Sequence, residues 1–489
     1  MNKNYFKKAF GVIFIAIFLE AVNKMFLSPI LIVIVLLGGL YFSVKLRGFY
    51  LFHPIKVLKG MLSGSKNTGE SSFKSVTLAL AGTLGVGNIV GVSSAVMFGG
   101  AGAVFWMWVG AFISMSLKYS EILLGVKYRC TRIINTSVSY YGGAAYYIRD
   151  GLSGEGVKGR TPHILGGVFA IFCVVNSLTT GTAIQTGAVS EAAKETLRIS
   201  PFTVAVILVV FVLLAMLVGN DRFSSITVVL IPIVSLVYIV MSLYVIFVGI
   251  KEVPRVFSEI ISEAFSIRCA GSGILGTSLA RGLRYGISRG IISNEAGCGT
   301  APAAHARANV KTPTQQGFWG IFEVFADTVI LCSMTAFSVL IYRGESDSLS
   351  SDGMRYTLAA YENVVGDTAG YLMTVCVFVF AYATVLCQFY YGIESIGYLS
   401  KGKLLSFLYT VLFFGMIFYG ALSPAEEVWQ ITDLSVGIMT VINVSVLLRL
   451  RKTVFRETNR YFNDSKRRKG LSQLSCDSPE NKLSENSDL

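Results

Sequence analysis

The chain has 489 residues, of which 53% are hydrophobic and only 15% charged. This composition is too apolar for an ordinary globular protein and predicts a polytopic membrane protein embedded in a lipid bilayer. The length allows roughly a dozen spanning helices of about 20 residues and excludes a large soluble domain. The formal net charge of +13 requires no nucleic-acid partner, because it is explained by lysines and arginines concentrated in alternate loops and in the tail.

The first segment, residues 1–27, is predicted to lie at the membrane interface. Lys3, Lys7 and Lys8 precede a short apolar run at 11–21. This run is too short to span a bilayer, and no convincing small-x-small cleavage site follows it. An interfacial helix is therefore favoured over a signal peptide.

Residues 28–452 are predicted to form an all-α membrane domain, because they contain eleven long apolar runs. The candidate spans are 28–46, 75–98, 101–126, 163–190, 201–219, 225–250, 274–308, 314–342, 366–396, 403–420 and 428–450.

The distribution of basic residues predicts the orientation of these spans. Lysine and arginine gather in alternate loops and in the tail, whereas the intervening loops are short, mixed or acidic. Because cytoplasmic loops retain positive charge, eleven spans place the N-terminus outside and the C-terminus in the cytoplasm. Residues 453–489 are first basic and then, after about Asn463, rich in Ser, Asn, Asp and Glu, which predicts a disordered cytoplasmic tail.

Two spans contain glycine-rich or polar interruptions. The stretch Ala81–Gly91 holds four glycines and Asn88, and the stretch Ser288–Pro302 holds Asn294, Glu295 and Gly297. Such breaks are tolerated in a bilayer only beside a cavity or inside the protein. They fall on the first and sixth of the ten helices that follow the first span, which indicates two inverted five-helix repeats with a midplane substrate site. A carrier is therefore favoured over a pore.

Charged residues within spans are functional candidates by default. Glu295 has two open roles, binding a substrate amine or capping the next half-helix, and the structural role is slightly favoured. Glu323 and Asp327 share a helix face, where they either relay protons or, as we favour, pair with arginines. The candidate partners are Arg281, Arg284 and Arg289. Lys118 and Glu121 lie near a span end and are expected to snorkel toward water.

Cysteine and histidine usage gives no sign of metal chemistry. The eight cysteines have no paired spacing, and His53, His163 and His305 fall in three different segments. A disulfide framework, a zinc site and a histidine-based active site are therefore not expected. No nucleophile and base occur at a plausible spacing either, so neither an enzyme nor an organic cofactor is predicted.

Three motifs carry a family resemblance: Gly85–Val92, Gly102–Trp108 with Lys118–Glu121, and Ser288–Gly297 followed by Ala301–Ala306. With them the chain resembles the alanine or glycine:cation symporters, the sodium:alanine symporter family, from about Tyr41 to Arg451. The resemblance implies a LeuT-type fold of two inverted five-helix repeats with one extra N-terminal helix. It also implies sodium-coupled uptake of small neutral amino acids across the plasma membrane.

The resemblance further implies a substrate site. The backbone amides around Val86 and Gly87, beside Gly85, would take the substrate carboxylate. Carbonyls near Ile292 and Ser293 would face its ammonium group. Gln185 resembles a substrate contact, and Asn88 either orders the break or touches an ion.

A sodium ion is the implied coupling ion. By the same resemblance, its ligands would be the backbone carbonyls of Ala81 and Leu84 with the hydroxyl of Thr384. Oxygen ligands of this kind suit a hard cation. Ala383 stands where the family usually has a second hydroxyl, which removes one further ligand.

Other positions depart from the family pattern. Val86 replaces a usual hydroxyl residue, Gly187 an asparagine, Gln388 a tryptophan and Glu323 a small residue. Exchanging tryptophan for glutamine opens space and adds hydrogen-bonding groups, so we expect a larger or more polar substrate than alanine, such as glutamine or serine. Glu323 leaves proton coupling open.

Three functions remain at this point. The main one is sodium-coupled symport of alanine or another small neutral amino acid by alternating access. The alternatives are a proton-coupled or exchange carrier for a larger neutral amino acid such as glutamine, using Glu323 or Glu295, and a membrane amino-acid sensor that signals through its tail. The sequence leaves the oligomeric state open.

Overall fold

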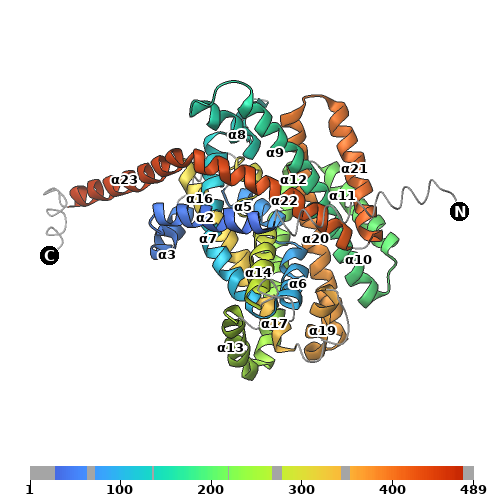
Figure 1. Cartoon of the computed structure of the whole chain (residues 1–489). Helices are drawn as coiled ribbons and strands as arrows, with labels where there is room; N and C mark the ends of the chain where they lie inside the picture. The colour runs from blue at the N-terminus through green and yellow to red at the C-terminus, as the bar shows by residue number, and fades with distance from the viewer. Residues whose placement is uncertain are drawn as a thin grey trace, which may run out of the picture.

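A computed structural model describes residues 28–62, 72–134, 137–218, 220–266, 278–342, 353–423 and 425–476. The expected interfacial segment at 1–27 lies outside these ranges. The described chain is almost entirely helical, as predicted (Figure 1). Up to the middle of the chain the elements are α2 Ser28–Lys45, α3 Phe49–Phe52, α4 Pro54–Leu62, α5 Ser72–Thr83, η2 Val86–Asn88, α6 Val90–Gly99, α7 Gly102–Lys127, β1 Cys130–Ile134, β2 Ser137–Tyr141, α8 Ala144–Gly154, α9 Thr161–Leu178, η3 Thr179–Ala183, α10 Ile184–Leu197, α11 Pro201–Val218 and α12 Asn220–Val248.

The second half continues with a similar mixture of long and short helices. The elements are η4 Ile250–Glu252, α13 Val253–Ala264, α14 Ser278–Asn294, α15 Pro302–His305, α16 Pro313–Val324, η6 Phe325–Cys332, α17 Ser333–Ile341, α19 Gly353–Val365, α20 Asp367–Leu399, α21 Lys403–Leu422, α22 Ala425–Arg449 and α23 Arg451–Cys476.

Membrane-spanning character follows from length and apolarity. Among the described residues seven helices are long and apolar enough to cross a bilayer, or eight if the bent pair Phe73–Thr83 and Val86–Gly99 is one span. Each of the eleven predicted apolar runs coincides with a helix or a broken helix pair. Helix α14 is not among these seven helices, because it is only 17 residues long and carries Arg281, Arg284 and Arg289.

Both helix breaks occur in the predicted stretches. Helix α5 ends at Thr83, a short 3-10 turn follows, and the axis bends by 57° before α6 continues. The second break begins later than predicted, because Ser288 to Asn294 still belong to α14. The backbone leaves the helix at Glu295, where φ is +51°, and Gly297 and Gly299 also have positive φ, of +85° and +81°. Glycine adopts this left-handed region without steric cost.

The helical first half of that stretch is explained by its packing against α7. A Cβ atom at Gly286 would lie 2.2 Å from the carbonyl oxygen of Ala103, and one at Gly290 would lie 3.0 Å from the side chain of Met107. Small residues at this spacing let two membrane helices approach closely. These glycines therefore serve helix packing, while the break itself starts at Glu295.

Two features correct the sequence prediction. The fold is not purely helical, because β1 and β2 form an antiparallel hairpin that pairs Cys130 with Tyr141 and Ile134 with Ser137. This hairpin and α8 lie at one end of the molecule, and α13 and α19 lie at the opposite end (Figure 1).

The tail is the second correction. From Asn463 to Cys476, where the sequence predicts disorder, α23 continues as a helix and projects from the bundle (Figure 1). The remainder of the predicted disordered tail, 477–489, lies outside the described residues. The first turns of α23 are anchored by packing: the hydroxyls of Thr458 and Tyr119 lie 2.6 Å apart, and Lys127 pairs with Glu457 at 2.7 Å. Low hydropathy alone did not reveal these tertiary contacts, which stabilise a helix of otherwise polar residues.

Candidate functional site

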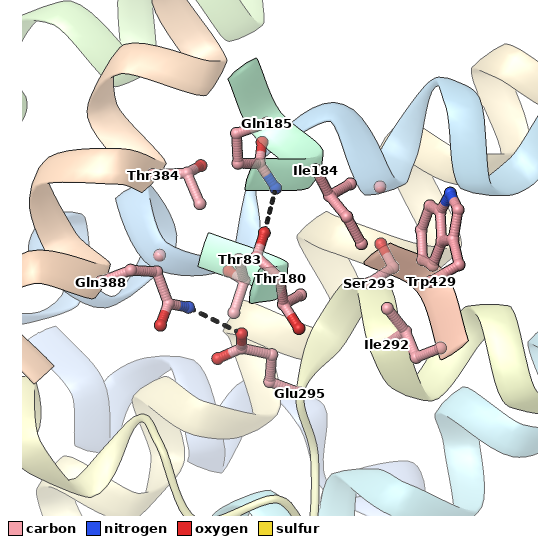
Figure 2. A pocket seen from close by; sticks show the side chains of 12 residues that line it. Thr83, Thr180, Ile184, Gln185, Ile292, Ser293, Glu295, Thr384, Gln388 and Trp429 are labelled. Carbon is pink, nitrogen blue, oxygen red and sulfur yellow. Dashed lines mark hydrogen bonds between the residues drawn. The ribbon is translucent and has the colours of Figure 1, made fainter. Parts of the chain in front are cut away.

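A pocket lies between the two helix breaks (Figure 2). It takes its walls from both breaks, from the π-helical turn η3, from α20 and from α22. Its lining residues are Gly82, Thr83, Gly87, Thr180, Ile184, Gln185, Ile292, Ser293, Glu295, Thr384, Gln388 and Trp429. Polar side chains and helix ends facing one internal space are the expected features of a carrier's substrate site.

At the first break, one backbone amide is bound to a pocket side chain. The Val86 N–H donates to Oε1 of Gln185 at 3.0 Å, and Nε2 of Gln185 donates to the carbonyl oxygen of Thr180 at 3.2 Å (Figure 2). The side chain of Val86 itself is fully buried. Gln185 therefore supplies, in this state, an acceptor oxygen of the kind that a substrate carboxylate would bring to the break.

Asn88 and Asp327 connect the two breaks. Nδ2 of Asn88 donates to Oδ1 of Asp327 at 2.7 Å, while Oδ1 of Asn88 accepts from the Gly85 N–H at 3.2 Å. The hydroxyls of Ser293 and Thr328 donate to Oδ2 of Asp327 at 3.0 and 2.8 Å. Asn88 thus orders the first break, and these three donors rather than an arginine satisfy Asp327.

The second break places Glu295 in the pocket. Its carboxylate accepts from the Thr300 hydroxyl at 2.5 Å and from Nε2 of Gln388 at 2.9 Å (Figure 2). The favoured helix-capping role is not what the geometry shows, because the backbone amides of Ala296 and Gly299 donate to Asn294 and Glu121 instead. Glu295 is consequently a buried carboxylate at the edge of the substrate space.

The predicted sodium ligands lie where α20 crosses the first break. The Thr384 hydroxyl donates to the carbonyl oxygen of Leu84 at 3.4 Å and to that of Phe380 at 3.0 Å. Ala81 is buried in the last turn of α5, whose carbonyl groups carry the negative end of the helix dipole. This donor set of carbonyls and one hydroxyl suits a sodium ion. The described part of the chain holds no group of three His, Cys, Asp or Glu side chains that could bind a metal.

Only one of the family departures lines the pocket. Gln388 does so, and its Oε1 is buried without a hydrogen-bond partner. Gly187, in contrast, faces α21, since a Cβ there would lie 3.0 Å from the carbonyl oxygen of Gly420. Gly187 therefore packs against α21 and does not line the pocket.

Sequence reasoning missed five pocket residues: Gly82, Thr83, Thr180, Ile184 and Trp429. A signal existed for Thr180, because the run Thr179–Thr182 is polar within an apolar span and forms a π-helical turn. The sequence carries no comparable signal for Trp429, which comes from the far end of the chain.

The snorkelling predicted for Lys118 and Glu121 is wrong. Both side chains are fully buried. Nζ of Lys118 lies 3.2 Å from the carboxylate of Glu323, so Glu323 pairs with a lysine of α7 and not with the arginines of α14. Of those arginines, Arg289 lies 3.8 Å from Asp433. The apolar span around Lys118 faces protein rather than lipid, and a buried charge in such a place needs a partner.

Comparison with known proteins identifies the family of the chain. The sequence profile of the sodium:alanine symporter family matches residues 13–474. The chain belongs to this family. A sodium/alanine symporter of Methanococcus maripaludis is 32% identical over 90% of this chain and 96% of its own. A probable sodium/glutamine symporter of Bacillus subtilis is 31% identical over 91% of this chain and 90% of its own.

Membership settles the class of function. As a sodium:alanine symporter family member, the chain is a transporter that couples amino-acid movement to sodium, and not an enzyme. A manganese transporter of Eremococcus coleocola shares the fold, with a TM-score of 0.51 at 15% identity over 78% of each chain. At this low sequence identity, the similarity is evidence for a shared fold and not for a shared substrate.

Proposed function

We propose that this symporter carries alanine or another small neutral amino acid into the cell with sodium, by alternating access around the two helix breaks. The observation that carries the proposal is the pocket between the breaks, which both half-helices line together with Thr384 and Gln388. Two inverted five-helix repeats would move around this fixed site in the plasma membrane. The N-terminus would lie outside and the C-terminus in the cytoplasm.

The substrate carboxylate would bind the amides of Val86 and Gly87. The Val86 amide currently donates to Gln185, so an incoming carboxylate would replace one acceptor by a stronger, charged one. The substrate ammonium would face the end of α14 near Ile292 and Ser293. Glu295 adds a negative charge at this place, which favours a cationic group.

Sodium would bind beside the substrate as the second transported species. Its ligands would be the carbonyls of Ala81 and Leu84 and the hydroxyl of Thr384, which already contacts the Leu84 carbonyl. Because this group bridges α5 and α20, ion binding there would favour the conformation in which the two helices lie together.

A second candidate substrate is a larger polar amino acid such as glutamine. The observation in its favour is Oε1 of Gln388, which is buried in the pocket wall without a partner and would accept a hydrogen bond from a side-chain amide. The similarity to a probable sodium/glutamine symporter supports the same candidate.

Uptake into proteoliposomes tests the proposal. We expect labelled alanine, glycine, serine or glutamine to accumulate under an inward sodium gradient and not under a proton gradient alone. Accumulation driven by protons without sodium would contradict the sodium site, and accumulation of glutamine alone would select the second candidate.

A further inference from the structure

A chain of buried charged and polar side chains from α7, α15 and α16 adjoins the second break. We infer that Lys118, Glu323 and His305 are positioning residues that clamp the two sides of this break and thereby set the affinity of the substrate site. The inference rests on the proposed function, since it assigns these residues a role in the same site. We refer to the three as the break clamp.

The clamp holds the break on its N-terminal side through Lys118. Nζ of Lys118 donates to the carbonyl oxygen of Asn294, the last residue of α14, at 3.0 Å. A cation at the end of a helix satisfies a carbonyl left free by the break and interacts favourably with the helix dipole. Lys118 thus stabilises the C-terminal end of α14 at Asn294, which lies directly between the pocket residues Ser293 and Glu295.

The clamp holds the second break on its C-terminal side through His305. Lys118 pairs with Glu323 on α16 at 3.2 Å, and Nε2 of His305 donates to the other carboxylate oxygen of Glu323 at 3.1 Å. Nε2 of Gln316 in turn donates to Nδ1 of His305 at 2.8 Å, which fixes the imidazole ring. Because His305 belongs to α15, the chain of contacts joins the segment before the break to the segment after it.

The neighbouring turn of α7 supports the same break from within. Oε2 of Glu121, one helical turn from Lys118, accepts from the Gly299 N–H at 3.1 Å and from Nδ2 of Asn443 at 2.8 Å. Asn443 also donates to the carbonyl oxygen of Gly297 at 2.8 Å. Helix α7 therefore contacts the end of α14 and the left-handed Gly299 directly, and it reaches Gly297 through Asn443 of α22.

Fold stability alone does not account for these charges. A buried ion pair gives up strong hydration, and well-packed apolar residues of similar volume often stabilise a protein as much or more. The clamp also lies directly beside the pocket, because Lys118 binds the carbonyl oxygen of Asn294, whose chain neighbours Ser293 and Glu295 both line the pocket. The clamp contacts both sides of the break and lies next to a pocket carboxylate, so it can hold the binding residues in place.

The test separates positioning from folding with a double variant. Removing one partner alone leaves a buried unpaired charge and endangers folding, whereas Lys118→Met with Glu323→Leu removes both charges and keeps the volume. We expect this variant to unfold near the wild-type temperature but to raise the KM for sodium-driven alanine uptake by tenfold or more, with kcat changed much less. The matched control is Lys127→Met with Glu457→Leu, which removes an ion pair between the end of α7 and α23, away from the break, and should leave KM unchanged.

A second measurement does not depend on transport. Cys298 lies within the break and is buried, and so is Cys376 on α20. Loss of the clamp should speed the reaction of Cys298 with N-ethylmaleimide at least fivefold in purified protein and leave Cys376 unchanged. Unchanged Cys298 labelling in the double variant overturns the clamp, whatever the uptake. If the wild type carries no amino acid with sodium while Cys298 labelling still rises, the proposed function fails and the clamp stands.

Discussion

At the scale of single residues, Gln388 is the position where this chain's pocket differs most clearly from the family pattern. It lines the pocket, donates to Glu295 and has a second polar atom without a partner. Its neighbour Gly181 is required for this approach, since a Cβ there would lie 2.3 Å from the Cβ of Gln388. We therefore expect substrate choice to depend on what the amide of Gln388 binds.

Replacing Gln388 by tryptophan should shift selectivity toward alanine. The larger ring would fill the space that a longer substrate side chain needs and would remove the unpaired acceptor. We expect the alanine-to-glutamine ratio of kcat/KM to rise by about tenfold, which corresponds to roughly 1.4 kcal/mol. Competition between the two labelled amino acids measures the ratio. The control is Gln388→Leu, which removes the polar amide without adding bulk. An unchanged alanine-to-glutamine ratio in Gln388→Trp would contradict this view of the pocket.

Thr384 allows a matching test of the ion site. Thr384→Val keeps the shape and removes the hydroxyl beside the Leu84 carbonyl, so we expect the sodium concentration for half-maximal uptake to rise about tenfold, as for the loss of one well-placed polar contact. Thr384→Ser should stay near wild type. The control is Thr374→Val on the same helix, whose hydroxyl contacts Thr196 away from the pocket. Equal sodium dependence in Thr384→Val and the wild type would exclude this hydroxyl as a ligand.

Sequence reasoning located much of the pocket because helix breaks are a local property. Gly87, Ile292, Ser293 and Glu295 all belong to the two interrupted spans, and all line the pocket. The burial of Lys118 was not predictable in the same way. Hydropathy does not tell a helix surrounded by protein from one facing lipid, and only the packing of α7 against α14 and α16 shows that this lysine has partners.

At the scale of helices, glycines decide how closely neighbours approach. A Cβ at Gly420 on α21 would lie 2.2 Å from the backbone oxygen of Ala183, which no side-chain movement can relieve. Gly420→Ala should therefore push α21 from η3 and destabilise the protein by about 1–3 kcal/mol. Thermal unfolding in detergent measures the effect.

The same helix provides the control for this prediction. Nothing lies within 4 Å of a Cβ at Gly415. Gly415→Ala should raise the unfolding temperature slightly or leave it unchanged, since alanine favours the helix more than glycine does. Equal effects of the two substitutions would mean that helix propensity, and not the close approach to Ala183, controls stability here.

At the scale of the whole molecule, the ends differ in charge as well as in structure. Around α13, at one end, the three carboxylates of Glu252, Glu259 and Glu263 outnumber the two basic groups of Lys251 and Arg255. The opposite end holds the β-hairpin and α8, with Arg129 stacked 3.6 Å over the ring of Tyr140 (Figure 1). Around α8, Arg129, Arg149, Lys158 and Arg160 outnumber Asp150 and Glu155. An excess of basic residues is expected at the cytoplasmic face.

This asymmetry predicts which end of the protein faces the cytoplasm. In a background with Cys130, Cys269 and Cys476 replaced by serine, the other five cysteines of the chain are buried. Cysteines introduced at Lys158, between α8 and α9, and at Lys251, before α13, are both exposed positions. We expect a membrane-impermeant maleimide to label Lys251→Cys on intact cells and Lys158→Cys only after permeabilisation. The reverse pattern would turn the molecule over in the membrane and place the N-terminus inside. Each cysteine is introduced in a separate variant, so that a label reports one position, and labelling after permeabilisation controls for expression.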